Sequence, residues 1–553
     1  MASPLPHHPN LPAAYFAIAE QQPDLVVYRQ PTVDAADPLN GPRLWHDTTY
    51  GQSVIRVKKL ARHLKRVGVR PGSKVAIVSS SRPEWMEADL AILSLGGIVV
   101  SVYQSLPAHE VAYILFDSEA EFAIVENQEQ VDKLLEIQQS ATAIPATEER
   151  KELTAEVRLQ HIVSIEQSDD HELVSNLAAI LAEGEEAPRP DEFQSLTRES
   201  LASLVYTSGT TGPPKGVMQT HGNHLANVEQ VMQLEMMRDN TDFMLFLPLA
   251  HSFAKLIGYI GFLTTASLKF PGVFDRRSSK MEPQSISRDI SESAALVVPV
   301  VPRLLEKMKA GVESNAESGG IKGLFLSVTL WSAREMYRAK EQGTAPGMKA
   351  QMAFAGTAGV RQKIKEKLFG PRLLFALSGG AKLPVEVARF FDSLEIEVLE
   401  GYGLTETCVA TNVNLLGKKK IGTVGPALPG VEQRIAADGE ILFRGPNVAI
   451  GYYNRPSATK KSWDADGWYA TGDLGSIDDA GYLTIEGRKK DIIVTSGGKN
   501  IAPARIEEGI KESKYVSQAV VVGDGRKYCV ALVTLNHEQV REWARSQGIA
   551  TLD

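Results

Sequence analysis

In the first part of the chain, stretches in which apolar residues recur with a helical period alternate with short apolar runs. A helical period runs over residues 52–67 and again around residues 84–94. Short apolar runs at residues 74–79, 98–102 and 123–125 predict buried strands between and after these helices. Helices that alternate with buried strands are typical of a doubly wound α/β subdomain, which we predict here.

A second α/β block is predicted from Leu201 to about Leu415. Its strands are expected at residues 203–206, 245–247, 295–299 and 373–378, each bounded by Gly, Pro, Ser or Thr. Because ligands in open α/β sheets bind outside the carboxyl ends of the strands, we expect the chemistry in the loops that follow. Residues 323–369 are helical in pattern, with Leu324, Val328 and Trp331 on one face that we interpret as packed on the core.

From residue 422 to 487 the chain is Gly-rich, with short alternating runs at 440–444 and 482–486 that predict a β subdomain. A small α+β unit follows, and we place the boundary near Lys490. The expected fold class is therefore α/β. A large N-terminal domain over residues 1–489 holds two doubly wound α/β subdomains and the β subdomain, and a small α+β C-terminal domain covers 490–553.

Composition narrows the function classes. The chain has 553 residues, of which 43% are apolar and 23% charged, which predicts a folded enzyme with more than one core. The formal net charge of −8 argues against a general nucleic-acid binder, because phosphate neutralisation needs clustered Lys and Arg. With Cys408 and Cys529 as the only cysteines, we expect no disulfide framework, and we expect a reducing, cytoplasmic location.

No export signal or membrane span is predicted. The first residues lack the basic start and apolar run of a secretion signal. The longest apolar run, residues 90–103, is interrupted by Ser94, Gly96 and Gly97 and falls short of the roughly 20 residues that a spanning helix needs. Contact with a membrane is therefore expected to be peripheral at most.

Residues 207–216, TSGTTGPPKG, carry the strongest chemical signal. They follow an apolar strand and combine glycines, which let backbone N–H groups approach a ligand, with hydroxyl donors and the cation Lys215. This composition suits a polyphosphate. The spacing does not match a Walker loop, in which Lys directly follows a Gly. Here Lys215 follows Pro214 and precedes Gly216. The alternative is a Gly- and Thr-rich surface turn.

The decapeptide resembles the phosphate loop of the adenylate-forming superfamily, which includes acyl-CoA synthetases, luciferases and peptide-synthetase adenylation domains. The resemblance covers nearly the whole chain from about Tyr15 onward. It implies that this loop contacts ATP through Thr207, Ser208, Gly209, Thr210, Thr211, Gly212 and Lys215. Lys215 is also expected to take part in catalysis.

A second signature of the superfamily is similar to residues 401–406, GYGLTE. The resemblance implies that Thr405 contacts the ATP phosphates and that Glu406 holds Mg²⁺, which makes both residues catalytic candidates. Two anions meet when a carboxylate attacks a phosphate, so a divalent ion and a cationic or hydroxyl donor must offset the charge. The expected nucleotide contacts around this signature are His251, Gly379, Gly380, Ala381, Glu400, Gly401, Tyr402 and Gly403. Tyr402 is expected to stack on the adenine.

Three later motifs follow in the order of the superfamily. Residues 469–473, YATGD, resemble the ribose motif, where Asp473 would accept hydrogen bonds from the sugar hydroxyls. Residues 487–491, GRKKD, resemble the hinge, with Arg488 as a ribose or phosphate partner and Lys490 as the pivot. Residues 495–501 resemble the loop that serves thioester formation, and this loop is expected to meet CoA through Gly497, Gly498 and Lys499.

Two further stretches, PLAH at residues 248–251 and VPRLLEK at 301–307, resemble the long-chain fatty acid-CoA ligase subgroup. Phe253, Leu256 and Tyr259 are candidates for an acyl tunnel, although their helical spacing also suits a core helix. After Phe253 the chain continues with Ala254 and Lys255, where the subgroup often has Glu, so the preferred chain length stays open. The nearby pair His221 and His224 lacks further ligands, which argues against zinc.

The resemblance implies an enzyme that uses ATP, Mg²⁺ and CoA to convert a long-chain fatty acid into acyl-CoA, AMP and pyrophosphate. Two alternatives remain: a ligase of the same fold for a medium-chain or aryl acid, and a catalytically weak nucleotide- or acyl-binding protein. The second alternative arises because nothing after Val533 resembles the late Lys motif of the superfamily, so we expect an incomplete C-terminal domain. The oligomeric state, including a homodimer, is left open.

Overall fold

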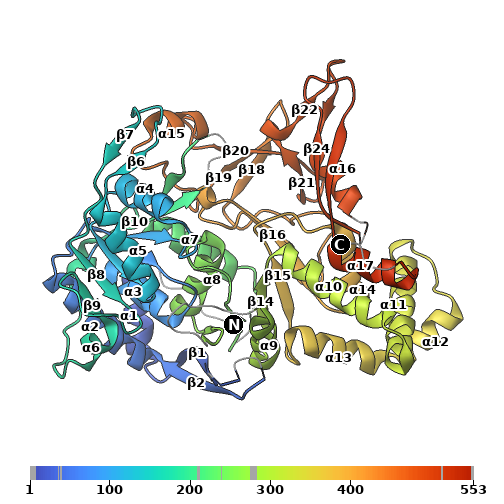
Figure 1. Ribbon diagram of the computed structural model, residues 1–553, viewed down its shortest axis with the longest axis horizontal. Coiled ribbons are helices and arrows are strands. Elements are labelled where there is room, and N and C mark those ends of the chain that lie inside the picture. Colours follow the sequence, from blue (N-terminus) through green and yellow to red (C-terminus); the bar gives the residue numbers. More distant parts are fainter. Residues whose placement is uncertain are drawn as a thin grey trace.

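A computed structural model describes residues 8–34, 36–37, 40–207, 212–237, 240–273, 283–511, 513 and 515–549. Two large sheets with their covering helices form most of the molecule, and smaller β elements lead to the C-terminal part (Figure 1). One core cluster runs continuously through residues of both large sheets, including Val75, Val99, Phe243 and Val297. The predicted α/β class is confirmed.

The first sheet has seven strands in the order β11-β10-β4-β3-β5-β8-β9. The strands are β3 (Lys74–Val78), β4 (Ile98–Val102), β5 (Phe122–Val125), β8 (His161–Ser164), β9 (Val174–Asn176), β10 (Leu201–Thr207) and β11 (Lys215–Thr220). Its helices are α2 (Tyr50–Arg66), α3 (Pro83–Ser94), α4 (Ala108–Ser118), α5 (Gln128–Gln139) and α6 (Leu177–Ala182). The pairings are parallel except for the β10–β11 hairpin. The helices and strands predicted for residues 52–125 lie within two residues of these bounds.

The second sheet has eight strands in the order β17-β16-β15-β14-β12-β13-β1-β2. The strands are β1 (Val26–Val33), β2 (Arg43–Thr49), β12 (Asp242–Met244), β13 (Ser267–Lys269), β14 (Val297–Val300), β15 (Phe375–Ser378), β16 (Val398–Tyr402) and β17 (Asn412–Val413). The predicted second block was wrong in two places. β10 pairs with β4 in the first sheet, and the strand expected at residues 245–247 lies three residues earlier in the chain, at β12. An apolar run does not specify its partner strand or its first residue.

Helix α7 (His221–Met232) contacts β11 of the first sheet and α8, and α1 (Leu11–Gln21) contacts α2, α3 and α8. The helices around the second sheet are α8 (Ser252–Leu263), α9 (Pro283–Ser293), α10 (Pro302–Glu317), α11 (Gly320–Glu341), α12 (Met348–Gly356), α13 (Ala358–Phe369) and α14 (Val385–Ser393). Figure 1 shows α11 and α12 at one edge of the molecule, outside both large sheets. Across the part of the chain that the structure describes, every helix is too short or too polar to cross a bilayer.

The predicted β subdomain is an antiparallel sheet of β18 (Glu432–Ile435), β19 (Glu440–Arg444), β20 (Tyr469–Ile477) and β21 (Leu483–Arg488). Between β19 and β20 the chain forms α15 (Pro456–Ser462). The C-terminal elements are β22 (Ile493–Val494), β23 (Asn500–Ile501), α16 (Pro503–Lys511), β24 (Val516–Val522), β25 (Val530–Leu535) and α17 (His537–Ser546). The domain boundary near Lys490 and the incomplete C-terminal domain stay predictions.

The face of α11 that we assigned to the core is exposed. Leu324 is 65% exposed and Trp331 is 45% exposed, so that assignment was wrong for both residues. The opposite side of α11 is the buried one, and it carries Gly323, Leu330 and Ala333. Small residues let the helix approach its neighbours closely, so the larger apolar side chains are left on the outside.

A buried ion pair joins α8 to α3 inside the core. Lys255 on α8 is 1% exposed, and its Nζ lies 3.2 Å from Asp89 Oδ1 on α3. The hydroxyl of Tyr259 donates to Asp89 Oδ2 at 2.9 Å, and the Lys255 ammonium lies 5.5 Å from the ring centroid of Trp85. Burial raises the pKa of the Asp89 carboxyl. Each of the two buried charges is therefore compensated by the other.

We predict that Lys255→Met lowers the free energy of unfolding by about 3–5 kcal/mol, because it leaves the Asp89 carboxylate buried without a cation. The loss should shrink as the pH falls, since a protonated carboxyl needs no cationic partner. Denaturant unfolding midpoints measure this effect. Adding Asp89→Asn should restore most of the lost free energy of unfolding. The matched control is Lys460→Met, which changes an exposed lysine. Equal losses in the single and double variants would contradict the ion-pair explanation.

Candidate active site

A cavity of about 940 Å³ is lined by residues from both large sheets and from the four-stranded sheet. Three strand ends open into it, because Thr207 ends β10, Ser378 ends β15 and Tyr402 ends β16. The residues that we predicted and that line it are Thr207, Lys215, His251, Phe253, Leu256, Gly379, Gly380, Gly401, Tyr402, Gly403, Thr405, Glu406, Arg488 and Lys490. The chain thus brings motifs from residue 207 to residue 490 to one place.

The phosphate loop joins β10 to β11. Its two ends face each other, since Thr207 pairs with Lys215 in the antiparallel register of the hairpin. The Lys215 ammonium lies 4.9 Å from the ring centroid of Tyr452, which lines the same cavity. Ser208, Gly209, Thr210 and Thr211 lie outside the described residues, so their predicted contacts stay predictions. The described ends supply a hydroxyl and a cation.

The turn after β16 carries Thr405 and Glu406. Glu406 is 9% exposed, and the hydroxyl of Tyr452 donates to its Oε1 at 2.8 Å. Burial raises the pKa of Glu406, while the hydrogen bond from Tyr452 and the charges of Arg488 and Lys215 lower it. The result is a carboxylate in a largely water-free position, near a cation and at the wall of the cavity.

The surroundings of Glu406 suit the coordination that Mg²⁺ prefers. Across the described ranges, no three His, Cys, Asp or Glu side chains gather into an all-protein metal cage. Mg²⁺ usually binds through one or two carboxylates and completes its shell with phosphate oxygens and water. A single buried carboxylate beside a phosphate loop supplies that protein contribution.

Buried polar contacts fix this turn against the phosphate hairpin. Gln219 of β11 donates from Nε2 to the backbone oxygen of Thr405 at 2.8 Å. His224 of α7 lies 2.9 Å from Ser203 Oγ through Nε2 and 3.0 Å from Cys408 Sγ through Nδ1. Burial lowers the pKa of His224 well below its usual value and raises that of Cys408. Both groups are therefore neutral members of the network.

The same turn has an unusual backbone. Cys408 has φ 49° and Val409 has φ 99°, which is a rare conformation for a β-branched residue. A Cβ at Gly403 would stand 1.3 Å from the backbone oxygen of Val409, so only glycine fits at that position. Strain of this kind persists only where the surroundings enforce it. Here the surroundings are the contacts made by Gln219 and His224.

The predicted ribose motif contributes a buried carboxylate. Asp473 on β20 is 5% exposed, its Oδ2 accepts from the hydroxyl of Tyr402, and its Oδ1 lies 2.9 Å from Arg488 Nε. Burial raises the pKa of Asp473, and the hydrogen bond from Tyr402 and the charge of Arg488 oppose that rise. Tyr402 and Arg488 line the cavity, whereas Asp473 stands directly behind them. The contact of Asp473 with a sugar stays a prediction.

Several predicted residues lie away from the cavity wall. Glu400 accepts from the backbone N–H of Leu383 at 3.0 Å and so shapes the turn next to β15, where Ala381 also lies. The turn between β22 and β23 contains Gly497, Gly498 and Lys499, none of which lines the cavity. Tyr259 does not line it either, because its hydroxyl is bound to Asp89 in the core.

One face of α8 gives the cavity an apolar wall. Phe253, Leu256, Ile257 and Ile260 line it from this helix, together with Phe243 and Phe375 from the second sheet. The spacing i, i+3, i+4, i+7 was readable in the sequence, but our selection included Tyr259 and missed Ile257 and Ile260. His251 begins the helix, since its Nδ1 accepts from the Phe253 N–H at 3.1 Å.

Comparison with known proteins agrees with this arrangement. The family model described as "AMP-binding enzyme" matches residues 16–453, and the model described as "AMP-binding enzyme C-terminal domain" matches residues 490–551. The chain belongs to the AMP-binding enzyme family. The predicted membership of the adenylate-forming superfamily is thereby confirmed.

The similar curated proteins include a "Long-chain-fatty-acid--CoA ligase FadD15" of Mycobacterium bovis, which is 32% identical over 538 residues. That match covers 97% of this chain and 84% of the relative. "Long chain acyl-CoA synthetase 6, peroxisomal" of Arabidopsis thaliana is 30% identical over 574 residues, which cover 99% of this chain and 77% of the relative. These two proteins are relatives from distant organisms.

Solved structures show the same fold. The Bacillus subtilis O-succinylbenzoate coenzyme A synthetase (MenE) in complex with ATP and magnesium has a TM-score of 0.67 at 21% identity, over 98% of this chain and 93% of that one. A Mycobacterium tuberculosis fatty acyl CoA synthetase has a TM-score of 0.65 at 22% identity, over 98% and 92%.

We predict that Tyr452→Phe moves the acid limb of Mg²⁺-dependent nucleotide binding to higher pH. Removing the hydroxyl removes a hydrogen bond that lowers the pKa of Glu406, so the carboxylate that suits the cation is lost earlier as the pH falls. A hydrogen bond to a charged group contributes about 1.5–3 kcal/mol, which corresponds to a shift of about one to two pH units. Calorimetric titrations at a series of pH values measure it.

The matched control is Tyr453→Phe, because the neighbouring Tyr453 donates to Glu119 at the surface, at 2.7 Å. This variant should keep the pH dependence of the unmodified chain. An identical profile for both variants would contradict the role given to the Tyr452 hydroxyl.

Proposed function

We propose that this chain is an ATP-dependent long-chain fatty acid-CoA ligase. It converts a fatty acid, ATP and CoA into acyl-CoA, AMP and pyrophosphate through an acyl-adenylate. The observation that carries the proposal is a single cavity lined by two chemically different groups of residues. Lys215, Thr405 and Glu406 belong to the polar group, and the apolar wall along α8 accepts an alkyl chain. The names of the two relatives, a fatty-acid–CoA ligase and an acyl-CoA synthetase, support the substrate class.

In the first half-reaction the carboxylate oxygen of the acid attacks the α-phosphorus of ATP, and the bond to pyrophosphate breaks. Lys215 and the Thr405 hydroxyl stabilise the negative charge on the phosphate oxygens by electrostatics and hydrogen bonding. Glu406 would hold Mg²⁺, and the bound ion would supply Lewis-acid neutralisation of phosphate charge. Tyr402 and Arg488 orient the nucleoside end of ATP.

In the second half-reaction the CoA sulfur attacks the carbonyl carbon of the acyl-adenylate, and AMP leaves. The loop that we assign to this step, with Gly497, Gly498 and Lys499, lies off the cavity wall. We therefore infer that residues 490–553 turn about Lys490 between the half-reactions. Lys490 lines the cavity at the start of this part, which supports its role as pivot. Such a movement gates the chemistry and does not accelerate the chemical step.

The cysteines indicate the cellular location. We infer a cytoplasmic location, which is supported by two unpaired cysteines at Cys408 and Cys529. A fatty acid, ATP and CoA are the expected partners.

We predict that the purified chain forms acyl-CoA from C12–C18 acids only when ATP, Mg²⁺ and CoA are all present. Glu406→Gln should lower the rate of acyl-adenylate formation by about 10²–10³, the range seen when one charge-stabilising group is removed. Mass spectrometry of the products over an acid panel measures both. Glu119→Gln, at an exposed carboxylate, is the control and should keep full activity.

Thioester from medium-chain or aryl acids alone would replace the long-chain assignment with the alternative ligase. Nucleotide binding without any product would favour the alternative of a catalytically weak binding protein. Full activity of Glu406→Gln would contradict the site itself.

We predict that Leu256→Trp shifts the chain-length preference toward shorter acids. Leu256 is buried on the α8 face that lines the cavity, so a larger ring there reduces the space for the alkyl chain. Each methylene that no longer fits should reduce kcat/KM by about fourfold, the equivalent of about 0.8 kcal/mol. Steady-state rates for a series of saturated acids measure it.

Leu44→Trp makes the same change at an exposed position and should leave the preference unaltered. An unchanged ratio of long- to short-chain rates in Leu256→Trp would mean that the acyl chain binds elsewhere.

A further inference from the structure

The helices α11 and α12 expose an unusual number of large apolar side chains. Six residues define what we call the α11–α12 surface: Ile321 (78% exposed), Leu324 (65%), Phe325 (58%), Trp331 (45%), Met348 (76%) and Met352 (71%). On α11 they recur at i, i+3, i+4 and i+10, and on α12 at i and i+4, so each set lies along one helical face. Water-exposed apolar side chains gathered in this way mark a binding surface.

The same segment carries positive charge in an acidic protein. Residues 320–369 hold nine Lys and Arg against three Glu, a net charge of +6, whereas the whole chain is −8. Lys322 and Lys349 lie on the two helices themselves, and Lys363 and Lys367 lie on the adjoining α13; all four are exposed. No ion pair joins any of these four to a carboxylate in the described ranges. Their charge is therefore free for an external partner.

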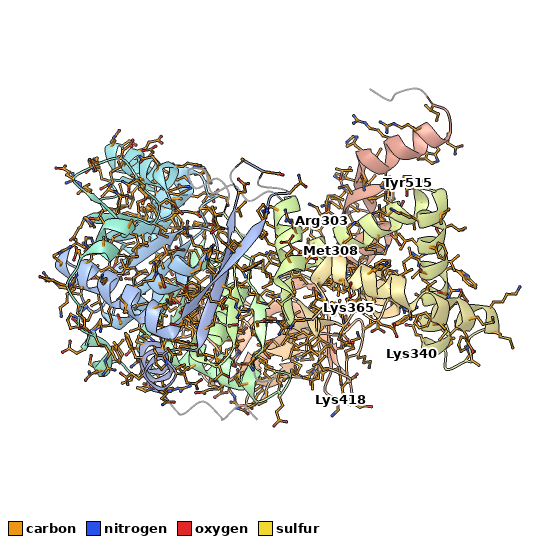
Figure 2. The ribbon with its side chains drawn as sticks, turned by 90° about the horizontal axis from the view of Figure 1, so that it is seen from below. Arg303, Met308, Lys340, Lys365, Lys418 and Tyr515 are labelled. Carbon is orange, nitrogen blue, oxygen red and sulfur yellow. The ribbon has the colours of Figure 1, made fainter. Side chains whose placement is uncertain are left out.

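The position of these helices suits contact with a large surface. Figure 1 shows α11 and α12 at the edge of the molecule, and Figure 2 shows Lys340 and Lys365 on this helical side, away from the seven-stranded sheet. Helices α11 and α12 also pack against each other, so the exposed side chains of both belong to one helical pair. A second group of exposed apolar residues on β24 and β25 lacks this charge, since residues 515–549 carry a net charge of only +1.

We propose that the α11–α12 surface docks the protein on an anionic lipid bilayer. The combination of Trp, Phe, Leu, Ile and Met with lysines is that of helices which lie in the plane of a membrane interface. Apolar side chains enter the boundary between headgroups and acyl chains, and the lysines meet the negative headgroups. This charge complementarity favours a membrane over a second copy of the chain, whose corresponding surface would present the same positive charge.

Docking of this kind has one consequence that rests on the proposed function. A long-chain fatty acid partitions into bilayers because each methylene favours leaving water by about 0.8 kcal/mol. A ligase held at the membrane therefore meets its acid where the acid is concentrated. The docking itself requires only the surface, so it can be tested without substrate.

The experiment is flotation of the full chain with vesicles of phosphatidylcholine alone and of phosphatidylcholine mixed with phosphatidylglycerol. We expect binding to the mixed vesicles that weakens as salt is raised. The triple variant Leu324→Gln, Phe325→Gln, Met352→Gln should lose most of this binding. The double variant Lys322→Gln, Lys349→Gln should bind about fivefold more weakly per lysine removed, the effect expected of one basic residue at an anionic surface.

The control is Leu44→Gln with Ile55→Gln, which changes two exposed apolar residues outside this surface and should keep full binding. Unfolding midpoints for all variants show whether each remains folded, and the exposed positions should leave them unchanged. Absent vesicle binding by the unmodified chain, or equal binding to neutral and anionic vesicles, would overturn the proposal. Full binding by the triple variant would overturn it too, as would a change from dimer to monomer in that variant without any vesicle binding.

Discussion

The chemistry of this protein depends on one constraint: residues delivered by two separate sheets must keep a fixed relation to one another. The phosphate loop comes from the β10–β11 hairpin of the seven-stranded sheet, and the Thr405–Glu406 turn follows β16 of the eight-stranded sheet. The Gln219 side chain bonds to the backbone of Thr405 at 2.8 Å and links the two. Together with the contact of His224 with Cys408, that bond holds the proposed phosphate loop and the proposed magnesium-binding carboxylate next to each other.

The turn also shows how such a relation is maintained. Val409 sits in a backbone region that β-branched residues avoid, and Gly403 is required because its neighbour leaves no space for a side chain. Local conformational preference therefore opposes this turn, and buried contacts from His224 and Gln219 impose it. Burial suits the proposed chemistry too, because it removes water from Glu406 and strengthens electrostatic contacts formed there.

Much of this structure was readable from the sequence, and the exceptions share a physical cause. Short, mostly apolar runs such as residues 98–102 predicted strands with their correct bounds, and the motifs at residues 401–406 and 487–491 predicted segments that reach the cavity, whereas the Gly-rich loop at residues 495–501 lies away from it. Sheet membership of β10 was missed because an apolar strand does not encode its neighbour. Tyr452 was missed because it reaches Glu406 from 46 residues away, with no motif of its own. The exposed face of α11 was taken for a core face, since apolar periodicity alone does not say which of two stripes is buried.

The central claim is that one cavity joins a carboxylate to the α-phosphate of ATP. The most direct test is to supply a long-chain acid labelled with ¹⁸O in its carboxyl group, together with ATP, Mg²⁺ and CoA, and to analyse the nucleotide product by mass spectrometry. Attack on the α-phosphorus predicts AMP that carries one ¹⁸O atom for each acyl-CoA formed. Unlabelled AMP, or ADP with the label in inorganic phosphate, would contradict the account.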